Sequence, residues 1–138
     1  MWVMKLQLSR THRRQLLAWA AEAGVYECCG LILGREDTVE KIEMTSNVAD
    51  NPMCEFEIDP LALIDAEKQA REGGPLILGY FHSHPNGLAK PSIKDAQMAA
   101  ADGRRWLIIA DGQITSWRPV DNAPNAAVSF ELEGFNEG

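Results

Sequence analysis

Two of the three histidines in this 138-residue chain, His82 and His84, are separated by a single serine. Side chains at positions i and i+2 of a β-strand point to the same side, so the two imidazoles would project together with Ser83 turned away. Two neutral imidazoles on one face are the beginning of a zinc site, where zinc binds histidine nitrogens at about 2.0–2.1 Å. A catalytic zinc site also needs a third protein ligand and keeps a fourth position open for water.

An aspartate further along the chain can supply that third ligand. The turn-rich loop PNGLAKP follows His84, and the motif S-x-x-D, from Ser92 to Asp95, then falls in the first turn of a predicted helix. From there the carboxylate can turn back toward the histidines, which gives a set of two imidazoles and one carboxylate. The same pair also fits a plain helix cap, with Ser92 as N-cap and Asp95 opposing the helix dipole. Both interpretations stay open at this point.

Hydrolysis at such a site requires a general acid/base that does not itself bind the metal. The candidate is Glu27 in VYECCGLILG, which lies just before an apolar strand, where burial can raise the pKa of a carboxyl group. The alternative is an ordinary solvated charge after a helix. The zinc-protease motif H-E-x-x-H and the deaminase motif H-x-E with P-C-x-x-C are both absent.

Elements that could position these residues are readable along the whole chain. Capping residues, helical spacing and stop glycines predict helices at 9–24, 60–74 and 92–103. Apolar or alternating runs predict strands at 30–34, 38–47, 54–59, 76–84, 105–112 and 113–120, with 126–135 as an edge strand or docking segment. This order is typical of a three-layer α/β domain, and the hairpins make its helix-flanked central sheet mixed and mostly antiparallel.

Composition restricts the partners and the location. A net charge of −7 argues against nucleic acid and anionic membranes and favours a partner with some positive charge. Since neither a secretory signal nor a run of about 18 apolar residues is visible, we expect a cytoplasmic protein. Three cysteines, two of them adjacent, make a poor disulfide framework, so Cys28, Cys29 and Cys54 are predicted to be reduced thiols in the core. Cysteine-protease chemistry is the weaker alternative.

Taken together, the motifs resemble the JAMM (MPN-plus) zinc metalloprotease family. They are E-x-C-G-L from Glu27, H-S-H-P from His82 and S-x-x-D from Ser92. Seven residues separate His84 from Ser92 and two more separate Ser92 from Asp95, as in the family signature. All catalytic positions of that signature are present, which argues against the inactive scaffold-type MPN branch.

The resemblance covers roughly residues 5–120, and we expect 1–138 to form a single JAMM/MPN-plus domain with a cytidine-deaminase-like fold. The N-x(n)-F-x-I-D-P pattern from Asn47 to Pro60 resembles the prokaryotic, stand-alone branch. Polyubiquitin-cleaving members of the family hold their substrates with long insertions, and the ten residues between Asp95 and the run WLIIADGQITSW leave no room for a large second insertion.

The resemblance implies a role for each motif residue. His82, His84 and Asp95 would hold one zinc ion. Glu27 would accept a proton from the attacking water and pass it to the leaving amine. The Ser92 hydroxyl would help to stabilise the oxyanion, an effect typically worth about 3 kcal/mol for a good donor.

The implied activity is that of a zinc-dependent metallopeptidase or isopeptidase. It would cleave amide bonds at the C-terminal tail, of Gly-Gly type, of a ubiquitin-like or sulfur-carrier protein. The extended tail would add as a strand beside a sheet edge. Two alternatives remain: a non-catalytic MPN-type binding module, and a peptidase acting on cell-wall peptides. The sequence leaves both a monomer and a homodimer open.

Overall fold

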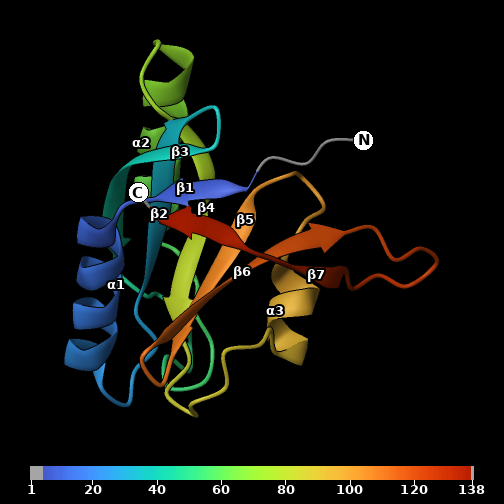
Figure 1. Cartoon of the computed structure of the whole chain (residues 1–138). Coiled ribbons are helices and arrows are strands. Elements are labelled where there is room, and N and C mark those ends of the chain that lie inside the picture. The colour runs from blue at the N-terminus through green and yellow to red at the C-terminus, as the bar shows by residue number, and fades with distance from the viewer. Residues whose placement is uncertain (1–4, 138) are drawn as a thin grey trace.

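A computed structural model describes residues 5–137 of the chain (Figure 1). In chain order its elements are β1 (Leu6–Leu8), α1 (Arg10–Ala23), β2 (Cys29–Arg35), β3 (Thr38–Thr45), α2 (Pro60–Arg71), β4 (Leu76–Ser83), α3 (Ile93–Met98), β5 (Arg105–Ala110), β6 (Gln113–Val120), β7 (Ser129–Glu133) and β8 (Phe135–Glu137). Within these residues the strands form one sheet in the order β7-β6-β5-β4-β2-β3-β1-β8.

The sheet is mixed, as predicted, because hairpins and crossovers alternate along the chain. Strand β2 pairs antiparallel with both β3 and β4, and β5, β6 and β7 form an antiparallel meander. Strand β4 runs parallel to β5, and α3 lies in the connection between them. Strand β1 pairs parallel with β3 and β8. The α/β fold with a mostly antiparallel central sheet is confirmed.

Helices cover both faces of this sheet, which gives three layers (Figure 1). Neighbouring residues of a strand point to opposite faces, so Ile32 joins the cluster packed against α1, whereas Leu31 and Leu33 join the cluster that contains Ala66 of α2. A third cluster is made of Cys29, Phe56 and Trp106, and Ala99 at the end of α3 packs against it.

The C-terminal segment joins the two ends of the sheet. Strand β7 pairs with β6 and β8 pairs with β1, although only Gly134 separates them. Figure 1 shows this segment, in dark red, crossing in front of the other strands. Arg105 contacts Asp37 of the β2–β3 turn and Glu133 of β7, the latter at 3.2 Å, and so fastens the crossing. The predicted edge strand thus exists and continues into a second strand.

Sequence analysis is wrong about one strand and one helix end, and it missed two strands. Residues 54–59 are not a strand. Apart from an isolated bridge between Asn47 and Ile58 they form a loop, because the side-chain amide of Asn47 rather than a neighbouring strand bonds the backbone of Glu55 and Glu57. Helix α3 ends at Met98 instead of reaching 103, since Ala99 turns into an extended conformation and packs against the cluster around Trp106. Strands β1 and β8 were not predicted.

The glycine of the E-x-C-G-L motif has a packing role that can be tested. Strand β2 is paired on both sides at Gly30, where a Cβ would collide with the Glu43 carbonyl and lie 2.5 Å from the Phe81 ring. We expect Gly30→Ala to lower the free energy of unfolding by about 1–3 kcal/mol in urea titrations. Gly134→Ala is the control, because its Cβ would meet only the flexible Lys5 side chain at 3.4 Å. Equal losses in both variants would contradict this explanation.

In the described part of the chain, no helix combines the length and apolar character needed to cross a membrane. The cysteine prediction is confirmed for Cys28 and Cys29, which are free and buried, and is wrong for Cys54, which is exposed on the 51–57 loop. Burial raises the pKa of Cys29 to about 11, so that thiol is a poor nucleophile. The cysteine-protease alternative loses its best-placed cysteine.

Candidate active site

Strand pairing brings the first candidate residues together. In the antiparallel pair of β2 and β4, Cys29 is opposite His82. The backbone N–H of Ser83 donates to the Cys28 carbonyl at 3.0 Å, so the register continues beyond the strand ends and Glu27 comes opposite His84. Ser83 points to the other side, where its hydroxyl accepts a hydrogen bond from the Cys28 N–H at 2.9 Å. The alternation expected from the H-x-H spacing is therefore present.

Helix α3 delivers the aspartate to the same place. Asp95 lies in its first turn, only 2% exposed, and its Oδ2 is 3.1 Å from Nε2 of both His82 and His84. The two Nε2 atoms are themselves 2.9 Å apart. The same Oδ2 accepts the Ser92 N–H at 2.8 Å, and Ser92 Oγ accepts the Asp95 N–H at 3.0 Å. The helix-cap interpretation of Ser92-x-x-Asp95 is confirmed, and the same carboxylate also contacts both histidines, as the ligand interpretation requires.

His82 Nε2, His84 Nε2 and Asp95 Oδ2 form a triangle, here called the donor triangle because each atom could donate a lone pair to a metal. Hydrogen bonds alone cannot satisfy all three of its contacts. The Nδ1–H of His84 donates to the Leu88 carbonyl at 2.8 Å, which leaves a lone pair on Nε2 of the neutral ring. His82 can place at most one proton on its own Nε2, and the carboxylate carries none. Even when His84 is protonated, two protons face three contacts. With both rings neutral, at least one contact therefore sets lone pairs against each other, and with His84 protonated the two Nε2–H groups face each other, in each case at about 3 Å.

A divalent cation fits where these lone pairs converge. Ligand atoms placed tetrahedrally about 2.0–2.1 Å from zinc lie roughly 3.3 Å apart, a few tenths of an ångström beyond the separations present here. Two histidine nitrogens and one carboxylate oxygen are also ligand types that zinc takes in catalytic sites. The Leu88 carbonyl bonds the outer nitrogen of His84 in the way that orients metal-binding imidazoles. The donor set therefore fits the predicted metal.

Glu27 is the second carboxylate of the site, and its environment differs from that of Asp95. It is 5% exposed, and its carboxylate lies in one group with His82 and His84 whose ligand atoms are all within 4.8 Å of one another. Its Oε1 is buried without a hydrogen-bond partner among the described residues. Burial raises the pKa of Glu27 to about 7, against the attraction of His84. The surface-charge alternative for this glutamate is wrong.

The two carboxylates are pushed in opposite directions. Burial acts to raise the pKa of Asp95, but its contacts with His82 and His84 hold that pKa below the ordinary range. Burial lowers the pKa of His82, whereas for His84 the contacts with Asp95 and Leu88 outweigh burial and raise it. Two carboxyl groups with separated pKa values are the usual arrangement for distinct roles in one site. Here Asp95 suits a ligand and Glu27 suits an acid/base.

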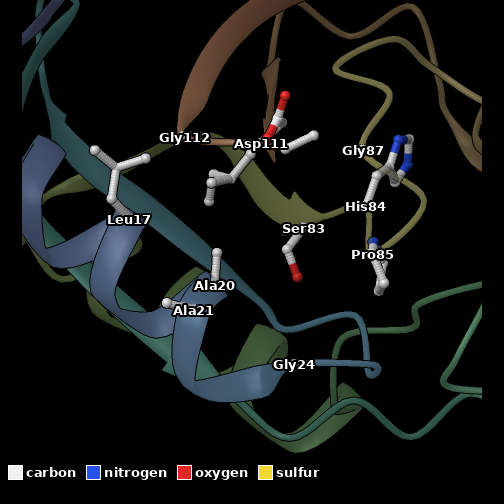
Figure 2. A pocket seen from close by; sticks show the side chains of 12 residues that line it. Leu17, Ala20, Ala21, Gly24, Ser83, His84, Pro85, Gly87, Asp111 and Gly112 are labelled. Atoms are coloured by element: carbon white, nitrogen blue, oxygen red, sulfur yellow. The ribbon is translucent and has the colours of Figure 1, made fainter.

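A cleft of about 430 Å³ lies on the α1 side of the sheet and borders the cluster at His84, whereas Glu27, His82 and Asp95 do not line it (Figure 2). Figure 2 shows helix α1 on one side of it, with Ser83, His84 and Pro85 on the other. Most of the lining residues are small or apolar, and they include Leu17, Ala20, Ala21, Gly24, Gly87 and Gly112. Small side chains let another backbone approach closely, so this lining leaves room for a second chain beside α1.

Two aromatic residues in contact with the cluster were missed by sequence analysis. The Phe56 ring stacks on His82 with centroids 4.1 Å apart, and Trp106 meets His82 edge-on at 5.6 Å. They fix the ring of a histidine whose Nδ1 has no hydrogen-bond partner among the described residues. Phe56 belongs to a segment predicted to be a strand, and no spacing rule links it to the H-x-H motif. Only the folded loop reveals this contact.

Known proteins are similar to this chain in sequence. The family model described as prokaryotic homologs of the JAB domain matches residues 9–120. The chain is similar to a desampylase of Haloferax volcanii, with 31% identity over 119 residues that cover 81% of this chain and 86% of that protein. It is also similar to a probable TtuB-protein conjugate cleaving protease of Thermus thermophilus, with 36% identity over 110 residues, 73% of this chain and 71% of that protein.

Solved structures share the fold. A protein of Desulfitobacterium hafniense superimposes with a TM-score of 0.76 at 27% identity, over 96% of this chain and 92% of that one. The structure described as JAMM, a metalloprotease-like zinc site in the proteasome and signalosome, gives a TM-score of 0.59 at 16% identity, over 98% and 99%. The chain therefore belongs to the prokaryotic JAB-domain family, the branch of the JAMM/MPN proteins that its motifs predicted.

Proposed function

We propose that this protein is a zinc-dependent isopeptidase that releases a ubiquitin-like or sulfur-carrier protein from an amide bond at the carrier's C-terminal tail. The observation that carries the proposal is the convergence of His82, His84 and Asp95 on one point beside Glu27, whose Oε1 has no hydrogen-bond partner among the described residues. A binding module would have no use for buried lone pairs that repel one another. For that reason we favour an enzyme over an MPN-type scaffold.

Each residue has a task in the proposed reaction. His82, His84 and Asp95 would hold zinc, which when bound supplies a Lewis acid and acidifies water. Glu27, with a pKa of about 7, takes a proton from the attacking water and returns it to the leaving amine. The Ser92 hydroxyl, at the start of α3, already accepts the Asp95 N–H, so its own proton remains available to donate to the developing oxyanion.

The substrate assignment is supported by the relatives and by the cleft. One relative is named a desampylase and the other a probable TtuB-protein conjugate cleaving protease, and we take both names to point to cleavage of protein conjugates. The cleft between α1 and the loop after His84 has a small-residue lining that suits a Gly-Gly tail in extended form. We infer that the carrier tail occupies this cleft, with its scissile carbonyl toward His84.

Metal content and cleavage test the proposal together. We expect about one zinc per chain by elemental analysis of protein purified without chelator. A linear fusion and an isopeptide conjugate of a ubiquitin-fold sulfur carrier serve as substrates. Their cleavage products are identified by mass spectrometry. A strong chelator should abolish cleavage after the tail glycine, and one equivalent of zinc should restore it. A carrier whose tail ends in Ala-Ala is the matched control and should be cleaved poorly.

Two results would contradict the proposal. If the wild-type protein takes up no zinc even after reconstitution, the metalloenzyme is excluded and a binding module replaces it. If zinc binds but neither carrier substrate is cut, while a cell-wall peptide is, the carrier assignment is wrong and the site serves another amide.

A further inference from the structure

The side chain of Asn47 lies at the centre of the loop that follows β3, next to the backbone of Glu27. Its Nδ2 donates to the Glu27 carbonyl at 2.9 Å and to the Glu55 carbonyl at 3.1 Å. Its Oδ1 accepts the N–H groups of Ala49 at 3.1 Å and of Glu57 at 3.0 Å. A carboxamide offers two donor protons and two acceptor lone pairs, so the Asn47 amide is fully used.

We propose that Asn47 is a positioning residue that sets the place of the Glu27 carboxylate, an inference that rests on the proposed function. The peptide of Glu27 is held from both sides by one loop. Its carbonyl accepts from Asn47, and its N–H donates to the Pro52 carbonyl at 2.8 Å. Glu27 precedes strand β2, whose pairing with β4 begins at Cys29, so these two loop bonds use both hydrogen-bonding groups of the Glu27 backbone.

The same Asn47 amide also holds the loop that carries Phe56, the residue that stacks on the candidate ligand His82. The Asn47 side chain bonds the backbone of Glu55 and of Glu57, the two neighbours of Phe56. The backbone of Val48 adds a bond to the Glu57 carbonyl at 2.9 Å, which closes the base of the loop. Phe56 is thereby held over His82. Asn47 thus ties together the acid/base and one side of the metal site, and touches neither reacting atoms nor the three ligand atoms.

No other side chain reproduces these four bonds. Aspartate keeps the two acceptor positions but turns lone pairs toward the carbonyls of Glu27 and Glu55. Alanine removes all four bonds and leaves those backbone groups without their partners. A displacement of about 1 Å at a catalytic group can cost on the order of 10²-fold in rate. The expected effect of losing the Asn47 donors is therefore on kcat.

The test compares Asn47→Asp and Asn47→Ala with Asn51→Asp. Asn51 is exposed on the same loop, so its replacement adds the same charge without removing any of these four bonds. We expect kcat per bound zinc to fall about 10–100-fold in both Asn47 variants, with KM for the carrier substrate within about threefold of wild type. The Asn51 variant should stay within about twofold of wild type in kcat.

A second readout does not depend on catalysis. Amide hydrogen exchange followed by NMR should show faster exchange at the N–H of Glu27 in both Asn47 variants, and unchanged exchange in the Asn51 variant. At Glu57, Asn47→Ala should accelerate exchange because it removes the acceptor. This measurement works on the zinc-loaded protein even if no substrate is cleaved.

The outcomes separate the two hypotheses. If wild-type protein cleaves no carrier substrate, the proposed function fails, and exchange at Glu27 alone decides whether Asn47 positions that residue. If wild type is active and the Asn47 variants match Asn51→Asp in kcat per zinc, Asn47 has only a structural role and the inference is overturned. If the Asn47 variants bind less zinc and melt at a lower temperature but keep the wild-type kcat per zinc, the inference is overturned in the same way.

Discussion

Replacing Glu27 by Gln should abolish cleavage while leaving the metal in place. Gln has nearly the same size and can fill the same buried position, but its amide cannot accept a proton from water and return it to the amine. General acid/base groups contribute about 10²–10⁴-fold, so we expect kcat to fall about 10³-fold. Single-turnover cleavage of a carrier conjugate, measured beside zinc content, checks this result.

Glu22→Gln is the matched control for this experiment. Glu22 lies near the C-terminal end of helix α1 and is exposed, so its replacement removes one negative charge outside the cluster. The control should retain both zinc and activity. If Glu27→Gln instead lost its zinc, Glu27 would be a ligand, which its distance to both histidines also allows. If it kept full activity, proton transfer would have to pass through another group.

Replacing His84 by Ala should remove the metal itself. The variant keeps His82 and Asp95 but loses the imidazole of His84. That ring is held at both nitrogens, since Nδ1 bonds the Leu88 carbonyl and Nε2 contacts Asp95. Mutation of an outer partner of a ligand costs 10–100-fold in metal affinity, and loss of a ligand should exceed that range. We expect well below one zinc per chain and a fall in activity of more than about 10³-fold.

The third histidine of the chain provides the control. His12 lies in the first turn of α1, outside the donor triangle, so His12→Ala should keep about one zinc per chain. Isothermal titration of zinc into metal-free protein compares the two variants directly. Unchanged zinc affinity in His84→Ala would remove His84 from the ligand set and leave Glu27 as the candidate for that place.

The alternation of strand residues was sufficient to predict which side chains of β4 face the site. His82 and His84 converge and Ser83 turns away, because side-chain direction in a strand depends only on position. Serine at an N-cap and an acid at N3 likewise predicted the start of α3. These local rules succeeded where side-chain direction or the hydrogen-bond partners are set within a single strand or helix turn. They failed for residues 54–59, whose partners belong to the distant side chain of Asn47.

The chemistry of the site was therefore determined by the sequence, and its electrostatics by the tertiary structure. Residue types and spacing were enough to propose two imidazoles, a carboxylate and a separate glutamate. That Glu27 has a pKa near 7 while Asp95 stays ionised follows only from burial and contacts, since the two carboxyl groups are chemically alike. The crossing of β7 into β8 is equally a tertiary matter, because parallel pairing with β1 joins residues from opposite ends of the chain.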